Sequence, residues 1–144
     1  GVDRRIDVIA TLIQKGGTVY DLEEAELCYA PQYGSAKDAA NFAGMIAANV
    51  LRNDMPIAHW STDHGSLLLD VRESAEIEAY AVSNATHIPL KQLRARLSEL
   101  PQDREIAVIC RSGQRAYLAT RILLQNGFSA KTLSGGVLAV QKKT

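Results

Sequence analysis

Short apolar runs that alternate with helical patterns constrain the fold of this chain more than any other feature. Residues 67–71 and 106–109 are apolar runs with the length of buried strands. Leucines recur at helical spacing over 90–100, and a second helical pattern over 114–125 ends at an Asn-Gly pair. Residues 132–134 read as one more strand. This order predicts an α/β fold, a mostly parallel sheet flanked by helices, with active loops at the carboxyl ends of its strands.

The first third of the chain has a different character. Apolar residues at helical spacing predict one helix over 2–13 and a short one over 21–27. A longer helix is expected to begin with Ser35 as its N-cap and to run to about Leu51. No strand pattern precedes Asn53. Three helices without a sheet of their own predict a piece of a larger packed unit.

Charge and hydropathy exclude several classes of partner. Sixteen basic and sixteen acidic residues give a formal net charge of zero, so no broad basic field exists to bind nucleic acid or acidic lipid. No stretch approaches the roughly 18 apolar residues of a membrane span, and the first residues lack the apolar segment of a signal peptide. We therefore expect no nucleic-acid partner, no membrane and a cytoplasmic location.

The two cysteines and three histidines give no sign of a metal site. Cys28 and Cys110 lie far apart without a Cys-x-x-Cys pair, which argues against a disulfide framework and a cysteine-rich metal centre. The histidines lack metal-ligand spacing, so no metal is predicted. Cys28 lacks a basic loop, and we expect it to be a packed thiol outside the site.

Cys110 is the candidate nucleophile because of where it stands. It follows the apolar run 106–109 directly, and the next helix begins inside the loop Arg111, Ser112, Gly113, Gln114 and Arg115. At a strand-to-helix turn, backbone N–H groups converge on the sulfur and the helix N-terminus adds roughly half a positive charge. The two arginines add full charges. These terms favour a thiolate, and a ring of N–H donors could also hold a persulfide.

The order of four motifs resembles a single-domain rhodanese. These are LLLDVR at 67–72, IPL at 88–90, CRSGQR at 110–115 and LSGG at 133–136. The resemblance implies that Cys110 accepts sulfane sulfur, that residues 111–115 cradle it, and that Arg111 and Arg115 attract an anionic donor or acceptor. Asp70 and Arg72 are implied to support the loop. The chain departs from the family at 80–82, where Tyr-Ala-Val replaces a Gly-His-Ile stretch.

The first half resembles the end of the dimerisation domain of a flavin-dependent pyridine nucleotide-disulfide oxidoreductase of the coenzyme A disulfide reductase type. The residues that show this are DLEEAELCYAPQYGSAKD at 21–38 and NFAG at 41–44. Some such reductases have a C-terminal rhodanese domain and act on persulfides or polysulfides. The resemblance predicts the domains 1–57, the end of the dimerisation domain, and 58–144, a rhodanese-like domain.

The same resemblance implies cofactors that these residues do not bind by themselves. The Gly-x-Gly-x-x-Gly loops for FAD and NAD(P)H are absent, so both cofactors are expected only on the missing domains of a longer parent chain. Other expected partners are small sulfane-sulfur donors and thiol acceptors. A homodimer is left open, as is whether Tyr29 and Tyr33 reach the thiol site of a partner subunit.

The leading function is that of a sulfurtransferase in which Cys110 becomes a persulfide and relays its sulfur to a thiol or to the reductase part. The alternative is a module that binds an anion or a persulfide partner without turnover. Phosphatase or arsenate-reductase chemistry is disfavoured. The loop of the related phosphatases has an arginine six positions after the cysteine, whereas this chain has Ala116 there.

Overall fold

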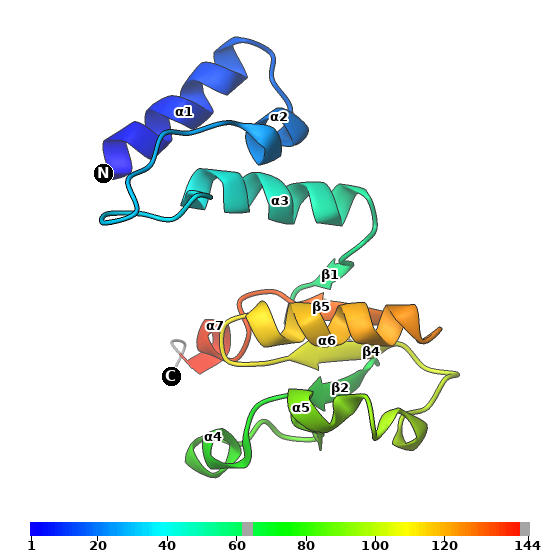
Figure 1. The fold of residues 1–144 in the computed structure, drawn as a ribbon. Helices are drawn as coiled ribbons and strands as arrows, with labels where there is room; N and C mark the ends of the chain where they lie inside the picture. Colours follow the sequence, from blue (N-terminus) through cyan, green and yellow to red (C-terminus); the bar gives the residue numbers. More distant parts are fainter. Residues whose placement is uncertain (62–64, 142–144) are drawn as a thin grey trace. The chain divides into compact units, whose positions relative to one another are not determined.

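A computed structural model describes residues 1–61 and 65–141, which form two compact units, Gly1–Asp54 and Met55–Thr144. The first unit is helical, with α1 (Val2–Gln14), α2 (Val19–Glu24) and α3 (Ala39–Leu51) (Figure 1). The second contains the sheet. The division lies three residues before the predicted boundary, and the domain identities assigned to the two units stay predictions.

In the first unit, α2 and α3 pack with their backbones in close contact. A Cβ atom on Gly44 of α3 would collide with the backbone of Leu22 and Glu23 in α2. The buried Asn41 side chain donates to the carbonyl oxygens of Leu22 and Ala25 at 3.3 and 2.8 Å. A small residue and a buried amide therefore hold the two helices together.

The bounds of two helices in this unit, α2 and α3, differ from the prediction. The N-cap of α3 is Asp38, not Ser35, because the Asp38 carboxylate accepts from the N–H of Ala40 and the Asn41 side chain accepts from the N–H of Asp38. The second helix begins and ends earlier than expected. Thr18 and Asp21 form a reciprocal cap at its start.

The second unit is built on a five-stranded sheet in which every described pairing is parallel, as predicted. The strand order is β1-β5-β4-β2-β3. The strands are β1 (Ile57–Ala58), β2 (Leu67–Asp70), β3 (Thr86–His87), β4 (Ile106–Ile109) and β5 (Ala130–Leu133). Asp70 pairs with Ile109, so β2 and β4 end level at the same edge of the sheet.

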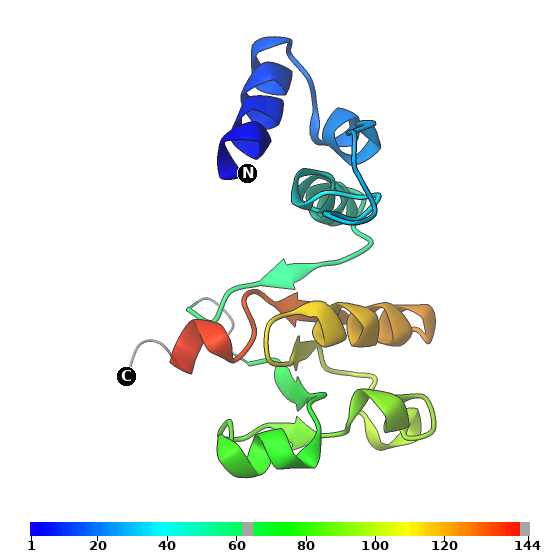
Figure 2. The same ribbon diagram turned by 60° about the vertical axis from the view of Figure 1, so that its left-hand side comes forward.

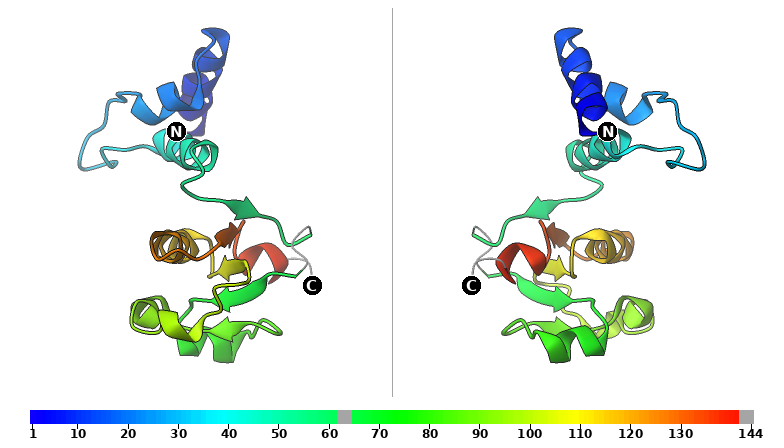
Figure 3. Two further views of the ribbon diagram at one scale, coloured as in Figure 1. Left: turned by 90° about the vertical axis from the view of Figure 1, so that its right-hand side faces the viewer. Right: turned by 90° about the vertical axis from the view of Figure 1, so that its left-hand side faces the viewer.

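Helices cover both faces of this sheet. They are α4 (Ser74–Ala79), α5 (Leu90–Leu93), α6 (Gln114–Gln125) and α7 (Leu138–Gln141), with a 3-10 turn at Leu97–Glu99. Figure 3 shows α5 and α6 on one side of the sheet and α7 on the other. Residues of β4 and Cys110 after it alternate accordingly: Ile106, Val108 and Cys110 belong to the larger core, whereas Ala107 and Ile109 belong to the smaller one with Trp60. This alternation is the expected pattern of a strand covered on both faces.

The leucine pattern over 90–100 was wrongly predicted to be one helix. The chain forms α5 and then a 3-10 turn, because the N–H of Arg96 is shared between the carbonyls of Gln92 and Leu93 and tightens the backbone. The sequence pattern also gave no sign of β1, β3, α4 or α7, each of which has six residues or fewer. No helix within the described ranges is long and apolar enough to cross a membrane.

Replacing Leu123 with alanine should destabilise the second unit strongly. Leu123 on α6 is fully buried in the larger core, so its removal leaves a cavity that costs about 2–5 kcal/mol. Leu118 on the same helix is 46% exposed, and L118A should change the free energy of unfolding by less than about 0.5 kcal/mol. Urea unfolding followed by Trp60 fluorescence measures both, and equal effects of the two variants would contradict this core.

Candidate active site

Cys110 follows the last residue of β4, and the loop 110–113 leads into α6. Figure 2 shows this passage from strand to helix in yellow. Its side chain is buried, with 1% exposed. The N–H of Gly113 donates to its Sγ atom at 3.1 Å. Gly113 has φ +122°, in the region that favours glycine, and is the N-cap of α6. The sulfur therefore receives a backbone hydrogen bond at the positive end of a helix.

The segment 136–138 binds the backbone of this loop. The N–H groups of Val137 and Leu138 donate to the carbonyls of Cys110 and Arg111 at 2.9 and 3.1 Å. A Cβ atom on Gly136 would lie 2.5 and 2.6 Å from these same two carbonyl oxygens. The Trp60 indole donates to the Gly136 carbonyl at 3.2 Å. The carbonyls of Cys110 and Arg111 are thus bound by this segment. The N–H groups of the loop can therefore be directed toward the sulfur.

The first turn of α6 supplies further donors. The first amides of an α-helix have no carbonyl partner within the helix, and those of Gln114, Arg115 and Ala116 occupy these positions. They follow Gly113 directly, so they lie on the same loop as the Cys110 sulfur. Among the described contacts, the amide of Gly113 donates to the sulfur, and the wider ring of N–H donors stays a prediction.

The two arginines of the loop, Arg111 and Arg115, differ in whether they form an ion pair within the described ranges. Arg115 forms a bidentate ion pair with Glu76 of α4, with N–O distances of 2.5 and 2.7 Å. This pair lowers the pKa of Glu76 from 4.5 to about 2, first through the hydrogen bonds from Arg115, and it raises the pKa of Arg115. Arg111 is exposed, and it has no ion pair in the described part of the chain. The loop therefore presents one uncompensated cation, where the sequence predicted two.

Asp70 and Arg72 form a buried ion pair behind the site. Their side chains are 1% and 4% exposed, and the closest N–O distance is 2.6 Å. The guanidinium also donates to the carbonyls of Glu76 and Tyr80, which lie in and just after α4. The pair thus fixes the helix that carries Glu76. This geometry is what the predicted supporting role requires, although the role itself stays a prediction.

Sequence reasoning missed three residues that shape this site. Glu76 lies 39 positions before Arg115, and no spacing rule indicates their contact. Trp60 packs in the second unit against the Gly136 segment, and no sequence pattern indicates this contact. Gly136 was part of a recognised motif without a role, and its conformation at φ +57° follows from its contact with the loop. The Nε2 atom of His87 lies 2.8 Å from the carbonyl oxygen of Arg72.

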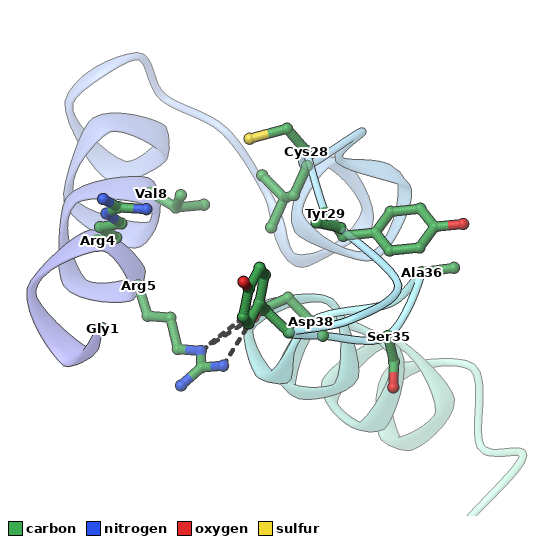
Figure 4. Close-up of a pocket in the computed structure, with 13 residues that line it drawn as sticks. Gly1, Arg4, Arg5, Val8, Cys28, Tyr29, Ser35, Ala36 and Asp38 are labelled. Atoms are coloured by element: carbon green, nitrogen blue, oxygen red, sulfur yellow. Dashed lines mark hydrogen bonds and ion pairs between the residues drawn. The ribbon is translucent and has the colours of Figure 1, made fainter.

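A separate cavity of about 650 Å³ lies within the first unit. Figure 4 shows Arg5 reaching from α1 to Asp38, with N–O distances of 2.8 to 3.0 Å, while the ring of Tyr29 points away from Arg5. Cys28 at this cavity is exposed, so its prediction as a packed thiol was wrong. Residue 28 lies in a segment after α2 that has no regular secondary structure. Tyr29 and Tyr33 are also exposed, and their role stays a prediction.

Comparison with known proteins identifies relatives of both parts of the chain. A family model described as a rhodanese-like domain matches residues 57–143. A sulfurtransferase of Allochromatium vinosum is 39% identical over 74 residues, which cover 51% of this chain and 69% of that protein. The matched residues include the loop at 110–115, the pair Asp70 and Arg72, and the segment that begins at Gly136.

Two solved structures are similar over nearly the whole chain. Reduced CoADR-RHD from Bacillus anthracis is 40% identical with a TM-score of 0.86, covering 93% of this chain and 25% of its own. An NAD-dependent persulfide reductase from A. fulgidus is 37% identical with a TM-score of 0.82, covering 96% and 26%. This chain therefore spans about a quarter of each. The resemblances stated from the sequence, to a rhodanese domain and to reductases with such a domain, are confirmed.

Replacing Gly136 with alanine should disturb the Cys110 loop specifically. The new methyl group would collide with the carbonyls of Cys110 and Arg111, so we expect a cost of about 1–3 kcal/mol and an altered rate of Cys110 alkylation. The measurement is iodoacetamide labelling in a Cys28→Ser background, together with urea unfolding. Gly127 also has positive φ but open space around it, so G127A should change stability while leaving the alkylation rate unchanged.

The Glu76–Arg115 pair should contribute to stability in a defined pH range. Because the pKa of Glu76 is lowered on folding, its contribution is fully present above its ordinary value of 4.5 and is lost as the pH falls through about 2. At near-neutral pH, Glu76→Gln should lower the free energy of unfolding by about 1 kcal/mol, since the pair is partly exposed. Urea unfolding across this range should show the difference between variant and wild type shrinking. A difference independent of pH would contradict a charge effect.

Proposed function

We propose, from the premise that this chain belongs to the rhodanese-like domain family, that Cys110 accepts a sulfane sulfur as a persulfide and passes it to a thiol. Membership of this family of sulfurtransferases supports an enzymatic role. The observation that carries the assignment to Cys110 is its Sγ atom beneath the Gly113 amide at the start of α6. A terminal sulfur with a negative charge would meet the same donors.

The chemistry balances in two steps. In the first, the Cys110 thiolate attacks the outer sulfur of a donor such as thiosulfate, the new S–S bond forms, and sulfite departs with the electrons of the broken bond. In the second, the sulfur acceptor attacks the terminal sulfur of the persulfide. The S–S bond that formed in the first step breaks, and Cys110 is again a thiolate. The loop amides would stabilise negative charge in both steps, and Arg111 would attract the anionic reactants.

A binding module without turnover is the second candidate, and one observation favours it. Cys110 is 1% exposed, so a donor must reach a sulfur that is covered in this conformation. A module of this kind would hold an anion or a persulfide partner at the N–H groups of the loop while the thiol stays inert. The two candidates differ in whether sulfur becomes bound to Cys110.

The wider role that we propose lies in a longer parent protein. Its partners would be small sulfane-sulfur donors, thiol acceptors and the FAD- and NAD(P)H-binding domains of a disulfide or persulfide reductase located in the cytoplasm. These residues do not themselves fit either cofactor, because the chain has no Gly-x-Gly-x-x-Gly loop and the described part of the first unit has no sheet. The support is the likeness to the two reductase structures.

The test is intact mass after incubation with thiosulfate or glutathione persulfide. In a Cys28→Ser background, the protein should gain the mass of one sulfur, because Cys110 is then its only thiol. Cyanide should remove this mass and release thiocyanate. A chain that also carries Cys110→Ser should gain nothing. A folded protein that forms no adduct with any sulfane donor would leave the binding module as the better account.

A further inference from the structure

We propose that Glu76 sets the donor specificity of the Cys110 site: by neutralising Arg115, it disfavours dianionic sulfur donors relative to monoanionic ones. This inference rests on the proposed sulfurtransferase function and concerns the substrate class of that site. Glu76 touches no reacting atom, so it is a positioning residue that acts through Arg115. No motif that led to Cys110 includes it.

The contact itself is specific and ordered. Both terminal nitrogens of Arg115 bind Glu76, one to each carboxylate oxygen. The same carboxylate accepts from the N–H of Glu73 at 3.0 Å, which closes the cap of α4. The Arg72 guanidinium donates to the backbone carbonyl of Glu76 at 3.3 Å. Glu76 is thus held at its side chain and its backbone, and its contact with Arg115 is a built feature of the fold.

The charge on Arg115 matters to the sulfur. Arg115 lies in the first turn of α6, five residues after Cys110 on the same loop. Besides the pair with Glu76, the charge of Cys110 contributes to raising the pKa of Arg115. Glu76 has a pKa of about 2 and is therefore ionised at neutral pH. The two charges cancel to a distant donor, which leaves Arg111 as the loop cation without an ion pair in the described ranges.

Charge arithmetic then distinguishes donors. The thiolate and the one loop cation without an ion pair in the described ranges leave the site with little excess positive charge. Such a site attracts a dianionic donor only weakly, and a monoanionic donor depends less on that attraction. Removing the negative charge of Glu76 should favour every anionic donor, and it should favour a dianion by about the square of the factor for a monoanion. The structure therefore predicts a preference that depends on donor charge, not on donor chemistry.

Thiosulfate and methanethiosulfonate test this with matched chemistry. Thiosulfate is a dianion that leaves sulfite, and methanethiosulfonate is a monoanion that leaves methanesulfinate. In both cases the Cys110 thiolate attacks the terminal sulfur, one S–S bond forms and one breaks. The measurement is kcat/KM for each donor, with cyanide as the acceptor. Effects on the Cys110 thiolate are common to both donors and cancel in the ratio of the two values.

In Glu76→Gln, which keeps an oxygen to accept from Glu73, kcat/KM should rise about threefold for methanethiosulfonate and about tenfold for thiosulfate. Arg115→Gln should shift the ratio of thiosulfate to methanethiosulfonate in the opposite direction by a similar factor. The double variant should restore the wild-type ratio, because the pair is again neutral. High salt should weaken all these shifts.

Glu78→Gln is the matched control, because Glu78 lies exposed on the same helix and its substitution changes the charge equally. It should leave the ratio unchanged. An unchanged ratio in both Glu76→Gln and Arg115→Gln, or an equal shift in Glu78→Gln, would overturn the inference and leave Glu76 as a structural residue. A wild-type protein that takes sulfur from neither donor, nor from glutathione persulfide, would instead refute the proposed function.

Discussion

The buried ion pair of Asp70 and Arg72 is the interaction on which the arrangement around Cys110 depends. Neither charge is accessible to water, so each requires the other, and removing one partner would leave an uncompensated charge inside the protein. The guanidinium has further donors, and these bind two carbonyls of the α4 segment. One pair at the end of β2 therefore determines where α4 lies, and with it the position of Glu76.

The loop itself is held from two opposite sides. On one side, Glu76 binds the side chain of Arg115, which anchors the first turn of α6. On the other, the segment from Gly136 binds the backbone carbonyls of Cys110 and Arg111. The first contact is between charged side chains and responds to pH and salt, whereas the second is between backbone groups and does not. The geometry of the sulfur and the electrostatics around it are thus controlled by different parts of the chain.

The sequence predicted the parts of this fold that depend on local pattern. The run that became β4 is buried at every residue and uniformly apolar, the run that became β2 begins with three leucines, and α6 ends at the expected Asn-Gly pair. The position of Cys110 followed from that strand and that helix. Two-residue strands such as β1 and β3 have no period to detect, and they form only because a neighbouring strand offers its edge. The contact of Glu76 with Arg115 is likewise tertiary, so the sequence suggested two free arginines in the loop, whereas only Arg111 lacks an ion pair among the described residues.

The support of the loop through backbone atoms has a consequence for how such a site can diversify. The contacts behind Cys110 use carbonyls, amides and the small volume of Gly136, and they require no particular side chain at positions 111, 112 or 114, all of which are exposed. Residues there can change without rebuilding the turn that holds the sulfur. A duplicated copy of this domain could thus acquire a new reaction partner by exchanging a few outward-facing residues, while its nucleophile stays in register with the start of α6.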